Sequence, residues 1–292
     1  MKRAKLFSTL LALSLAASAL AQDHSGFYRP LTLAPADAPS SGGGGAGADD
    51  EKAQAAELAQ KLQNPVAVLL VAPIQNNWDF GYGAANAMRY TANVQPILPI
   101  TLSKDWKLIS RTIVPIIYAE SPTVGGSSKF GFGDTLQSLF FSPSKPTSGG
   151  WIWGAGPAFL LPTGTEGFSA HRWAIGPTAF LLKQNSGWIY GILANHLSSF
   201  AGSGPANVNA TYLQPFVSYT TKTLTTFGVN TESTYDWDRR QWTVPLIGNV
   251  SQLIAVGRQP ISFGLGLKYY ADRPSGGPDW GLRFVVTFLF PK

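Results

Sequence analysis

The chain has 292 residues, and only 13% of them are charged, against about 25% in ordinary soluble domains, so the composition disfavours a large water-facing surface. Its formal net charge of +6 falls to +6 − 3 = +3 once Lys2, Arg3 and Lys5 at the N-terminus are set aside, and no run of basic residues then indicates nucleic-acid binding. The lack of cysteine excludes disulfides, thiolate catalysis and cysteine-ligated zinc.

Residues 1–21 have the pattern of a secretory signal peptide. A basic start precedes an apolar run from Leu6, and the small-residue pattern Ala19-Leu20-Ala21 precedes the expected cleavage before Gln22. The apolar run is about 15 residues long, whereas a membrane-spanning helix needs about 20, so we favour a cleaved signal over an anchor. Residues 22–50, which contain three prolines and the tract SSGGGGAGA, predict a flexible linker.

Residues 51–64 predict a short amphipathic helix. Asp49 or Asp50 is the expected N-cap, and Pro65 is the expected stop. A narrow apolar stripe at helical spacing is formed by Ala55, Leu58, Ala59 and Leu62. Such a helix could dock on the rest of the protein, enter a cavity as a plug or contact a partner, and the pattern leaves these alternatives open.

Residues 65–292 change to the period of two that is typical of β-strands. In 86–100 apolar residues from Met88 onward take every second position, and the positions between them include Arg89, Thr91, Asn93 and Gln95. The stretches 224–237 and 260–272 have the same form, with one apolar and one polar face. The segments 130–141 and 187–199 alternate less regularly, as they would if they contained bulges.

The last strand shows the two faces most clearly. Arg283 and Thr287 lie on one face. The opposite face is an apolar row of Trp280, Leu282, Phe284, Val286, Phe288 and Phe290. A soluble sandwich would turn such a row into its core, whereas a membrane barrel would turn it toward lipid.

Strand length and connection length favour the membrane barrel. Most strands span about 11–17 residues, against a globular mode of about 5–6, and crossing a bilayer takes about 9–11. Short turns and long loops alternate, which is typical of outer-membrane barrels. The turns are expected near 101–104, 185–186, 222–223 and 258–259, and the loops near 74–85, 119–129, 163–170, 200–206 and 272–279, with 142–149 and 237–240 as exceptions.

Tryptophans near strand ends indicate an aromatic girdle at the two membrane interfaces. The girdle candidates are Trp106, Trp151, Trp173, Trp188, Trp237, Trp242 and Trp280. The fold class that follows is all-β, a transmembrane antiparallel up-and-down β-barrel of about 12 strands (range 10–14) over residues 65–292, with a short N-terminal helix. The first expected strand is 66–73 and the last is 280–290. An even number of strands returns both chain ends to the same rim.

Several stretches also carry a family resemblance. They are ELAQKLQNPVAVLLVAPIQNNWDFGYG (57–83), VQPILPITLSKDWKLISRTIVPII (94–117), GPAFLLPT (156–163), ANHLSSFAG (194–202), LQPFVSYTT (213–221) and the final VVTFLFPK. The chain resembles the bacterial outer-membrane barrel proteins grouped with the MetA pathway of phenol degradation, which are often labelled "transporter" or "neuromedin U". The resemblance implies a membrane barrel and the transport of small aromatic or other hydrophobic compounds.

The C-terminal strand is similar to the aromatic-ended signal that the barrel assembly machinery recognises, with Phe284, Phe288 and Phe290 on one face, although Pro291 and Lys292 follow the last Phe. The expected location is therefore the outer membrane of a Gram-negative-type envelope. The expected partners are outer-membrane lipid, the assembly machinery and a small-molecule solute, with no nucleic acid and no cofactor.

The leading functional hypothesis is passive passage of a small solute through the barrel. The candidate lumen-lining residues are Arg89, Asn93, Gln95, Arg111, Arg172, Asn230, Glu232, Lys268 and Arg283, and rings of such groups tune selectivity. The alternative is a sealed barrel in which these side chains pair with one another and fill the interior.

An outer-membrane acyl hydrolase is a hypothesis of a different class. His196 and Ser198 have the His-x-Ser spacing seen in outer-membrane phospholipase A, and residues two apart share one face of a strand. No acidic residue is placed as a third member, so we assign no catalytic residue. The three histidines, His24, His171 and His196, lack metal-ligand spacing, and no metal site is expected.

Overall fold

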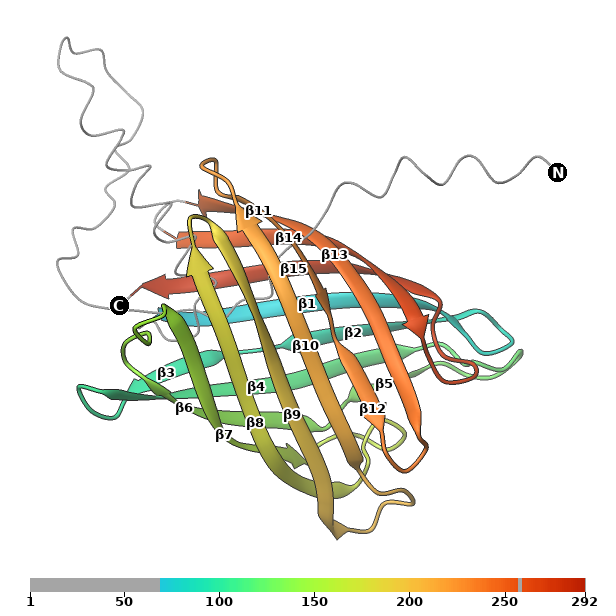
Figure 1. Cartoon of the computed structure of the whole chain (residues 1–292). Helices are drawn as coiled ribbons and strands as arrows, with labels where there is room; N and C mark the ends of the chain where they lie inside the picture. The colour runs from blue at the N-terminus through green and yellow to red at the C-terminus, as the bar shows by residue number, and fades with distance from the viewer. Residues whose placement is uncertain (1–68, 257–258, 292) are drawn as a thin grey trace.

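The computed structural model describes residues 69–256 and 259–291 (Figure 1). These residues form one closed antiparallel β-barrel of 12 membrane-crossing strands, as the alternation predicts. None of the described residues forms a helix long and apolar enough to span a membrane. The predicted signal peptide (1–21), linker (22–50) and helix (51–64) lie outside the described residues.

Fifteen β-strands make up the barrel because three of the crossings are each divided into two. They are β1 (Leu69–Tyr82), β2 (Ala87–Val94), β3 (Ile97–Thr101), β4 (Trp106–Ala119), β5 (Lys129–Phe132), β6 (Thr135–Pro143), β7 (Trp151–Leu161), β8 (Arg172–Asn185), β9 (Trp188–Gly202), β10 (Asn209–Thr220), β11 (Thr225–Thr231), β12 (Ser233–Asp236), β13 (Gln241–Val256), β14 (Gln259–Asp272) and β15 (Trp280–Pro291).

Prolines, which cannot donate a ladder hydrogen bond, explain two of the divisions. Pro96 separates β2 from β3. On β13, Pro245 lies between the register partners of Thr231 and Thr234, so the ladder is interrupted opposite Glu232, where β11 ends and β12 begins. A divided crossing therefore reflects a local gap in hydrogen bonding within one continuous strand path.

Each of the 12 crossings pairs with the next one along the chain, and β1 closes the barrel against β15 in a register that runs from Leu69↔Pro291 to Phe80↔Trp280. No sheet edge is left open in this arrangement, which a barrel in lipid requires. Figure 1 shows β1 beside β15, with the strands inclined across the barrel axis.

Side chains alternate between the interior and the outer surface, as the last strand illustrates. Leu282 and Phe290 point outward and are 40% and 41% exposed, whereas Arg283 between them points inward and is 3% exposed. The outward face is rich in exposed Leu, Ile, Val and aromatic side chains, above all on β8, β9, β13, β14 and β15. Buried side chains, polar and apolar alike, therefore collect in the barrel interior.

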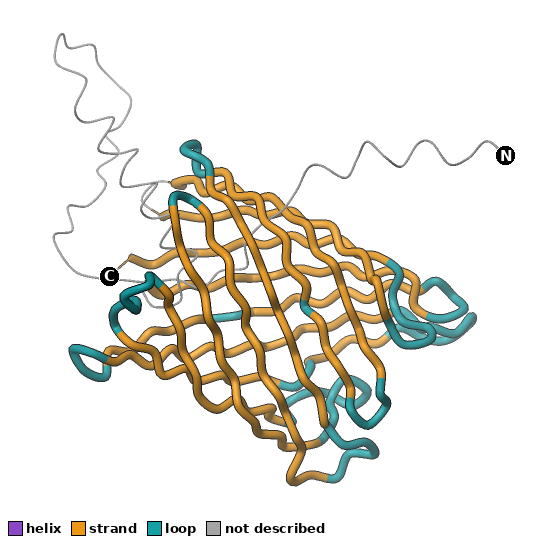
Figure 2. Tube along the Cα trace, in the orientation of Figure 1, coloured by secondary structure: helices purple, strands orange, loops and turns teal. Residues whose placement is uncertain are grey.

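The connections lie at two opposite ends (Figure 2). We call one end the turn rim, with the connections 102–105, 144–150, 186–187 and 221–224, and the other the loop rim, with the connections 83–86, 120–128, 162–171, 203–208, 237–240 and 273–279. The turn rim carries Trp106, Trp151, Trp153 and Trp188, and the loop rim carries Trp173, Trp237, Trp242 and Trp280. Tryptophans thus ring both ends of the barrel.

Two expectations about strands need correction. The first strand was expected over 66–73 with a loop over 74–85, but β1 continues to Tyr82 and only 83–86 connects it to β2. Residues 187–199, which alternate poorly by polarity, form a regular strand whose Ile189 and Leu193 are buried and whose Trp188 is half exposed. Both faces of β9 are apolar, so polarity alone could not separate them.

Candidate functional site

The barrel interior has two walls of opposite character. One wall, which we call the polar wall, consists of inward polar side chains from β1, the β2–β3 junction and the stretch from β11 to β15. Its members are Gln75, Asn77, Asp79, Gln95, Asn230, Glu232, Asn249, Lys268, Tyr270 and Arg283. The other wall, which we call the apolar wall, is a buried cluster from β3, β4, β6, β7, β8 and β9. Its members are Ile97, Ile109, Phe140, Ile152, Phe180, Leu182 and Leu193.

Arg283 is the centre of the polar wall. Its two terminal nitrogens each donate to a separate carboxylate oxygen of Glu232 at 2.7 Å, and its Nε donates to Asn77 Oδ1 at 2.8 Å. The Arg283 side chain is 2% exposed, while the Glu232 side chain keeps 22% of its surface exposed inside the barrel. A bidentate pair of this kind holds both side chains in one orientation and leaves the carboxylate as the accessible partner.

Lys268 forms the second ion pair of the polar wall. Its Nζ lies 2.6 Å from Asp79 Oδ1 and 3.5 Å from Asn77 Oδ1. The Tyr270 hydroxyl donates to the same Asp79 oxygen at 3.0 Å. Asn77 thus joins the two ion pairs, and each buried cation faces its own carboxylate, as buried charges require.

The network extends to β2 and β4 through amides. Gln95 Nε2 donates to Gln75 at 2.8 Å, and Gln95 Oε1 accepts from Arg111 Nη2 at 2.8 Å. The Gln75 amide also lies within hydrogen-bond distance of the Arg283 guanidinium. Arg111 is therefore linked to the polar wall by a neutral group.

Asn230 and Asn249 continue the polar wall along β11 and β13. Asn230 Nδ2 donates to Glu232 at 3.4 Å, and Asn249 Nδ2 donates to Asn230 at 3.5 Å. Asn93 points inward from β2, where its register partner on β1 is Gln75. These neutral amides surround the charged centre with donors and acceptors.

Arg89 and Arg172 lie nearer the loop rim. The Arg89 guanidinium lies 5.7 Å from the centre of the Phe168 ring, in the connection 162–171. Arg172 donates to the carbonyls of Gly202 and Gly204 at 2.9 and 2.6 Å, so it ties β8 to the neighbouring connection. Both arginines thus contact connections at the loop rim.

The connection 162–171 reaches over part of the barrel mouth. It joins β7 to β8, yet Phe168 contacts Arg89 on β2, which is separated from β7 by β4 and β6 in the sheet order. Asp134 fixes both ends of this connection, since its carboxylate accepts from the backbone N–H of Gly164 at 3.0 Å and of Ala170 at 2.7 Å. The connection therefore extends along the loop rim from β7 to β2.

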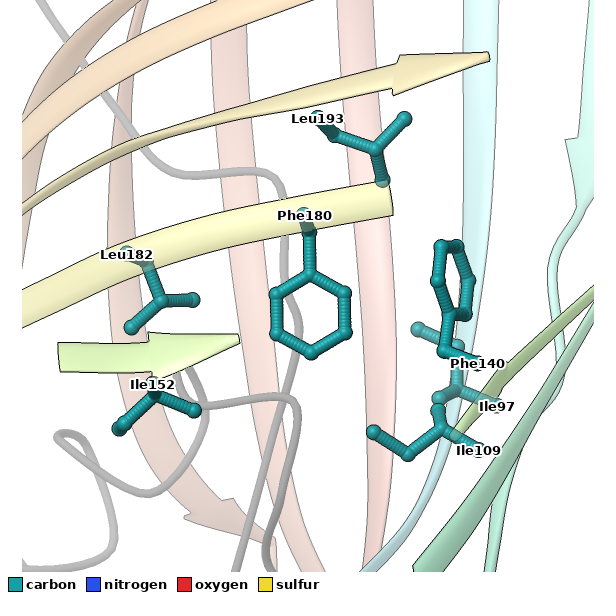
Figure 3. Packing of buried hydrophobic residues seen from close by; sticks show 7 residues of the cluster. All are labelled: Ile97, Ile109, Phe140, Ile152, Phe180, Leu182 and Leu193. Carbon is teal, nitrogen blue, oxygen red and sulfur yellow. The ribbon is translucent and has the colours of Figure 1, made fainter. Parts of the chain in front are cut away.

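The apolar wall is packed like a protein core (Figure 3). The Phe140 and Phe180 rings meet nearly edge to face, with centroids 5.3 Å apart and planes at 69°. The Phe180 ring lies close against the backbone of β7, because a Cβ added at Gly154 would lie 2.5 Å from its Cε1 atom. Tyr212 and Phe216 of β10 are half-buried and pack against the cluster.

His196 and Ser198 share a face, as their spacing predicts, but this face is the outer surface. The register pairs His196 with Thr211, and His196 Nδ1 lies 2.9 Å from the Thr211 hydroxyl, which also accepts from the Trp237 indole at 2.8 Å. No hydrogen bond joins His196 to Ser198 among the described residues. Nowhere in residues 69–256 and 259–291 does a group of three or more His, Asp and Glu side chains lie close enough together to hold a metal ion.

Gln75, Asn77 and Asp79 are polar-wall residues that the sequence analysis missed. They alternate with outward Ile74, Asn76 and Trp78. Asn76 is polar although it faces outward, where Tyr90 donates to it at 2.7 Å, and this polar residue hid the period of two. The run of apolar residues at 74, 78 and 80 is the signal that could have revealed the strand.

Comparisons with known proteins give a fold and no sequence match. An outer membrane channel from Pseudomonas putida F1 is similar in structure, with a TM-score of 0.59 and 14% sequence identity over 76% of this chain and 94% of that chain. Outer membrane phospholipase A from Escherichia coli has a TM-score of 0.46 and 12% identity, over 76% and 92%. Neither a protein-family model nor a curated protein sequence matches this chain. The chain therefore has the fold of an outer-membrane β-barrel.

Proposed function

We propose that the protein gives small amphipathic solutes, including hydrophobic and aromatic compounds, a passive route across the outer membrane through the barrel interior. The observation that carries this proposal is the pairing of a polar wall with an apolar wall inside one closed barrel. An amphipathic solute can lay its apolar body along one wall while its polar group exchanges hydrogen bonds with the other.

The outer membrane is the proposed location. The fold is that of outer-membrane barrels, the outward surface is apolar, and tryptophans lie at both rims, where indoles prefer the interface between lipid and water. The signal pattern in residues 1–21 and the aromatic C-terminal strand support export and insertion by the barrel assembly machinery. The turn rim then faces the periplasm. Transport of aromatic compounds also agrees with the resemblance to the phenol-degradation family.

Single-channel recording in planar bilayers tests the route. The purified protein should give stable conductance steps, and a chain lacking residues 22–64 should be measured beside it to ask whether that segment limits the current. Liposomes that contain the protein should also take up small neutral aromatics faster than protein-free liposomes. Silence from correctly folded samples of both chains, without faster uptake, would refute the proposal and favour a sealed barrel.

Hydrolysis of lipid acyl esters is the second candidate function. It is favoured by the hydrogen bond between His196 Nδ1 and Thr211, which orients the ring as the third member of a catalytic triad does, and by Ser198, which is exposed on the same face. Ser198 would have to rotate toward His196 Nε2 to be activated, and catalytic contacts often tighten only with substrate. Loss of phospholipid hydrolysis in Ser198→Ala would support this function, and no hydrolysis by the unaltered protein would remove it.

A further inference from the structure

Arg111 lies where the two walls meet. On one side its register partner is Ile97 of the apolar wall, and Ile109 of the same wall precedes it by two residues on β4. Two residues before Ile97 on the same crossing, Gln95 of the polar wall accepts from Arg111 Nη2, and the register partner of Arg111 on the other neighbouring strand, β6, is Ser138. An arginine at this boundary can present its charge beside apolar surface inside the barrel.

Of the three inward cations Arg111, Lys268 and Arg283, Arg111 is the one that has no hydrogen-bonded carboxylate among the described residues. Arg283 faces Glu232 at 2.7 Å and Lys268 faces Asp79 at 2.6 Å. Glu232 also attracts Arg111 electrostatically, but both of its oxygens are occupied by Arg283. The bond to the neutral amide of Gln95 is the one hydrogen bond that Arg111 makes to described residues.

The remaining donors of Arg111 are accessible. A guanidinium carries five N–H donors, and one of them is used. Among the described residues, the buried side-chain polar atoms without a partner are Ser144 Oγ and Arg172 Nε, so no nitrogen of Arg111 is buried without a partner. Arg111 is half-buried, and its Nε and Nη1 have no acceptor among the described residues and are not fully buried, so water or a ligand can accept from them.

Apolar surface lies beside these donors. Ile113 follows Arg111 on the inward face of β4 and is half-buried. Tyr212 packs with Phe216 against the apolar wall, whose Ile97 is the register partner of Arg111. A ligand whose charged group sits on Arg111 would therefore place its body against aliphatic and aromatic side chains.

We propose that Arg111 forms an anion-binding subsite in the barrel interior for small organic monoanions with an apolar body, such as aromatic carboxylates. The carboxylate accepts a pair of hydrogen bonds from the guanidinium fork, and the ring lies against Ile113 and Tyr212. A single negative charge fits because Arg283 and Lys268 are already neutralised. This subsite rests on the proposed function, since it lies on the proposed route.

Equilibrium binding of radiolabelled benzoate to the purified full-length protein in detergent tests the subsite, with benzamide as the uncharged probe of the same shape. The protein should bind benzoate more tightly than benzamide. Arg111→Gln should weaken benzoate binding about tenfold or more, because a charge-assisted bidentate contact is lost, and should leave benzamide unchanged. The affinity of Arg111→Lys for benzoate should lie between that of the unaltered protein and that of Arg111→Gln, because lysine keeps the positive charge but lacks the guanidinium fork.

Lys145→Gln is the matched control, because it removes one positive charge from an exposed connection at the turn rim. It should bind benzoate as the unaltered protein does. Equal affinity for benzoate and benzamide, or unchanged benzoate binding in a folded Arg111→Gln protein, would overturn the subsite. Displacement of benzoate by an equal concentration of chloride would also overturn it, because the site would then select charge alone.

The binding assay separates this inference from the proposed function. Conductance with no Arg111-dependent benzoate binding would leave the route standing and remove the subsite. Arg111-dependent benzoate binding without conductance would do the reverse, because the subsite would then belong to a barrel that binds solute without passing it.

Discussion

The polar wall and the apolar wall line the same barrel interior but are held in place by different interactions. On the polar wall each of two buried cations is matched to a carboxylate, and Asn77 connects the pairs. On the apolar wall, Phe140, Phe180 and their neighbours are held by packing of apolar side chains against one another. A pairwise network fails when one member is removed, whereas a packed cluster loses contacts in proportion to the atoms deleted. The comparison therefore predicts different responses to substitution.

Arg283→Met should give the largest loss of stability. It leaves Glu232 inside the barrel without its bidentate partner, and breaking a buried pair in this way costs about 3–5 kcal/mol in free energy of unfolding. Urea unfolding of the folded protein in detergent measures the effect. Arg239→Ala is the control, because it breaks an exposed ion pair with Asp236 of similar length, 2.6 Å, and should cost about 1 kcal/mol or less. Equal losses in the two variants would contradict the assigned role of the polar wall.

Phe180→Ala should lower the free energy of unfolding by about 3 kcal/mol, because it removes a ring that is 3% exposed and packs on Phe140. The neighbouring residue Leu181 points outward and is 40% exposed. Leu181→Ala should cost clearly less, since detergent or lipid fills the space that it leaves. The same urea titration compares them, and a larger loss for Leu181→Ala would mean that inward and outward faces have been exchanged.

Glu232→Gln should change ion selectivity more than stability. The Gln side chain still accepts a hydrogen bond from Arg283, but the net charge of the interior rises by one positive unit. The permeability of anions relative to that of cations should therefore rise several-fold. Reversal potentials across a salt gradient measure the ratio. Asp236→Asn makes the same charge change at the end of β12 near the loop rim and should shift the ratio little. A shift toward cations in Glu232→Gln would contradict the inward placement of this carboxylate.

Phe168→Ala should have the smallest effect. It removes the ring that the connection 162–171 lays on Arg89, so single-channel conductance should rise, by about twofold at most, because the mouth widens while the interior is unchanged. Glu166→Ala is a control from the same connection, where the side chain is exposed. A fall in conductance with Phe168→Ala would show that the ring does not narrow the path.

The sequence predicts the polar wall far better than the apolar wall. Gln95, Asn230, Glu232, Lys268 and Arg283 stand out in the sequence because charged or amide groups alternate with apolar ones. Lipid surrounds the barrel, so such groups can occupy only the inward face. On β7, β8 and β9 both faces are apolar, so polarity does not say which residues point inward. Only packing against neighbouring strands shows that Phe180 points inward and Leu181 points outward.

The partners within the network could not be predicted either. Asp79 and Lys268 meet because β1 and β14 are both next to β15 in the closed sheet, and an alternation pattern carries no information about pairing between distant strands. Arg172 shows a different limit. The register shifts between Trp173 and Ala174, and the Arg172 guanidinium binds loop carbonyls, so its position in an alternating strand does not describe its contacts.

Accessibility of single cysteines tests most directly whether the inward faces line a water-filled path, and the chain offers a clean background because it contains no cysteine. Asn93→Cys on the inward face of β2 should react with a charged, water-soluble thiol reagent in planar bilayers, and the reaction should reduce single-channel conductance. The adjacent outward substitution, Val94→Cys, should neither react nor change the current. Protection of Cys at position 93, or a current reduced only by modification at position 94, would contradict a solute path through the barrel interior.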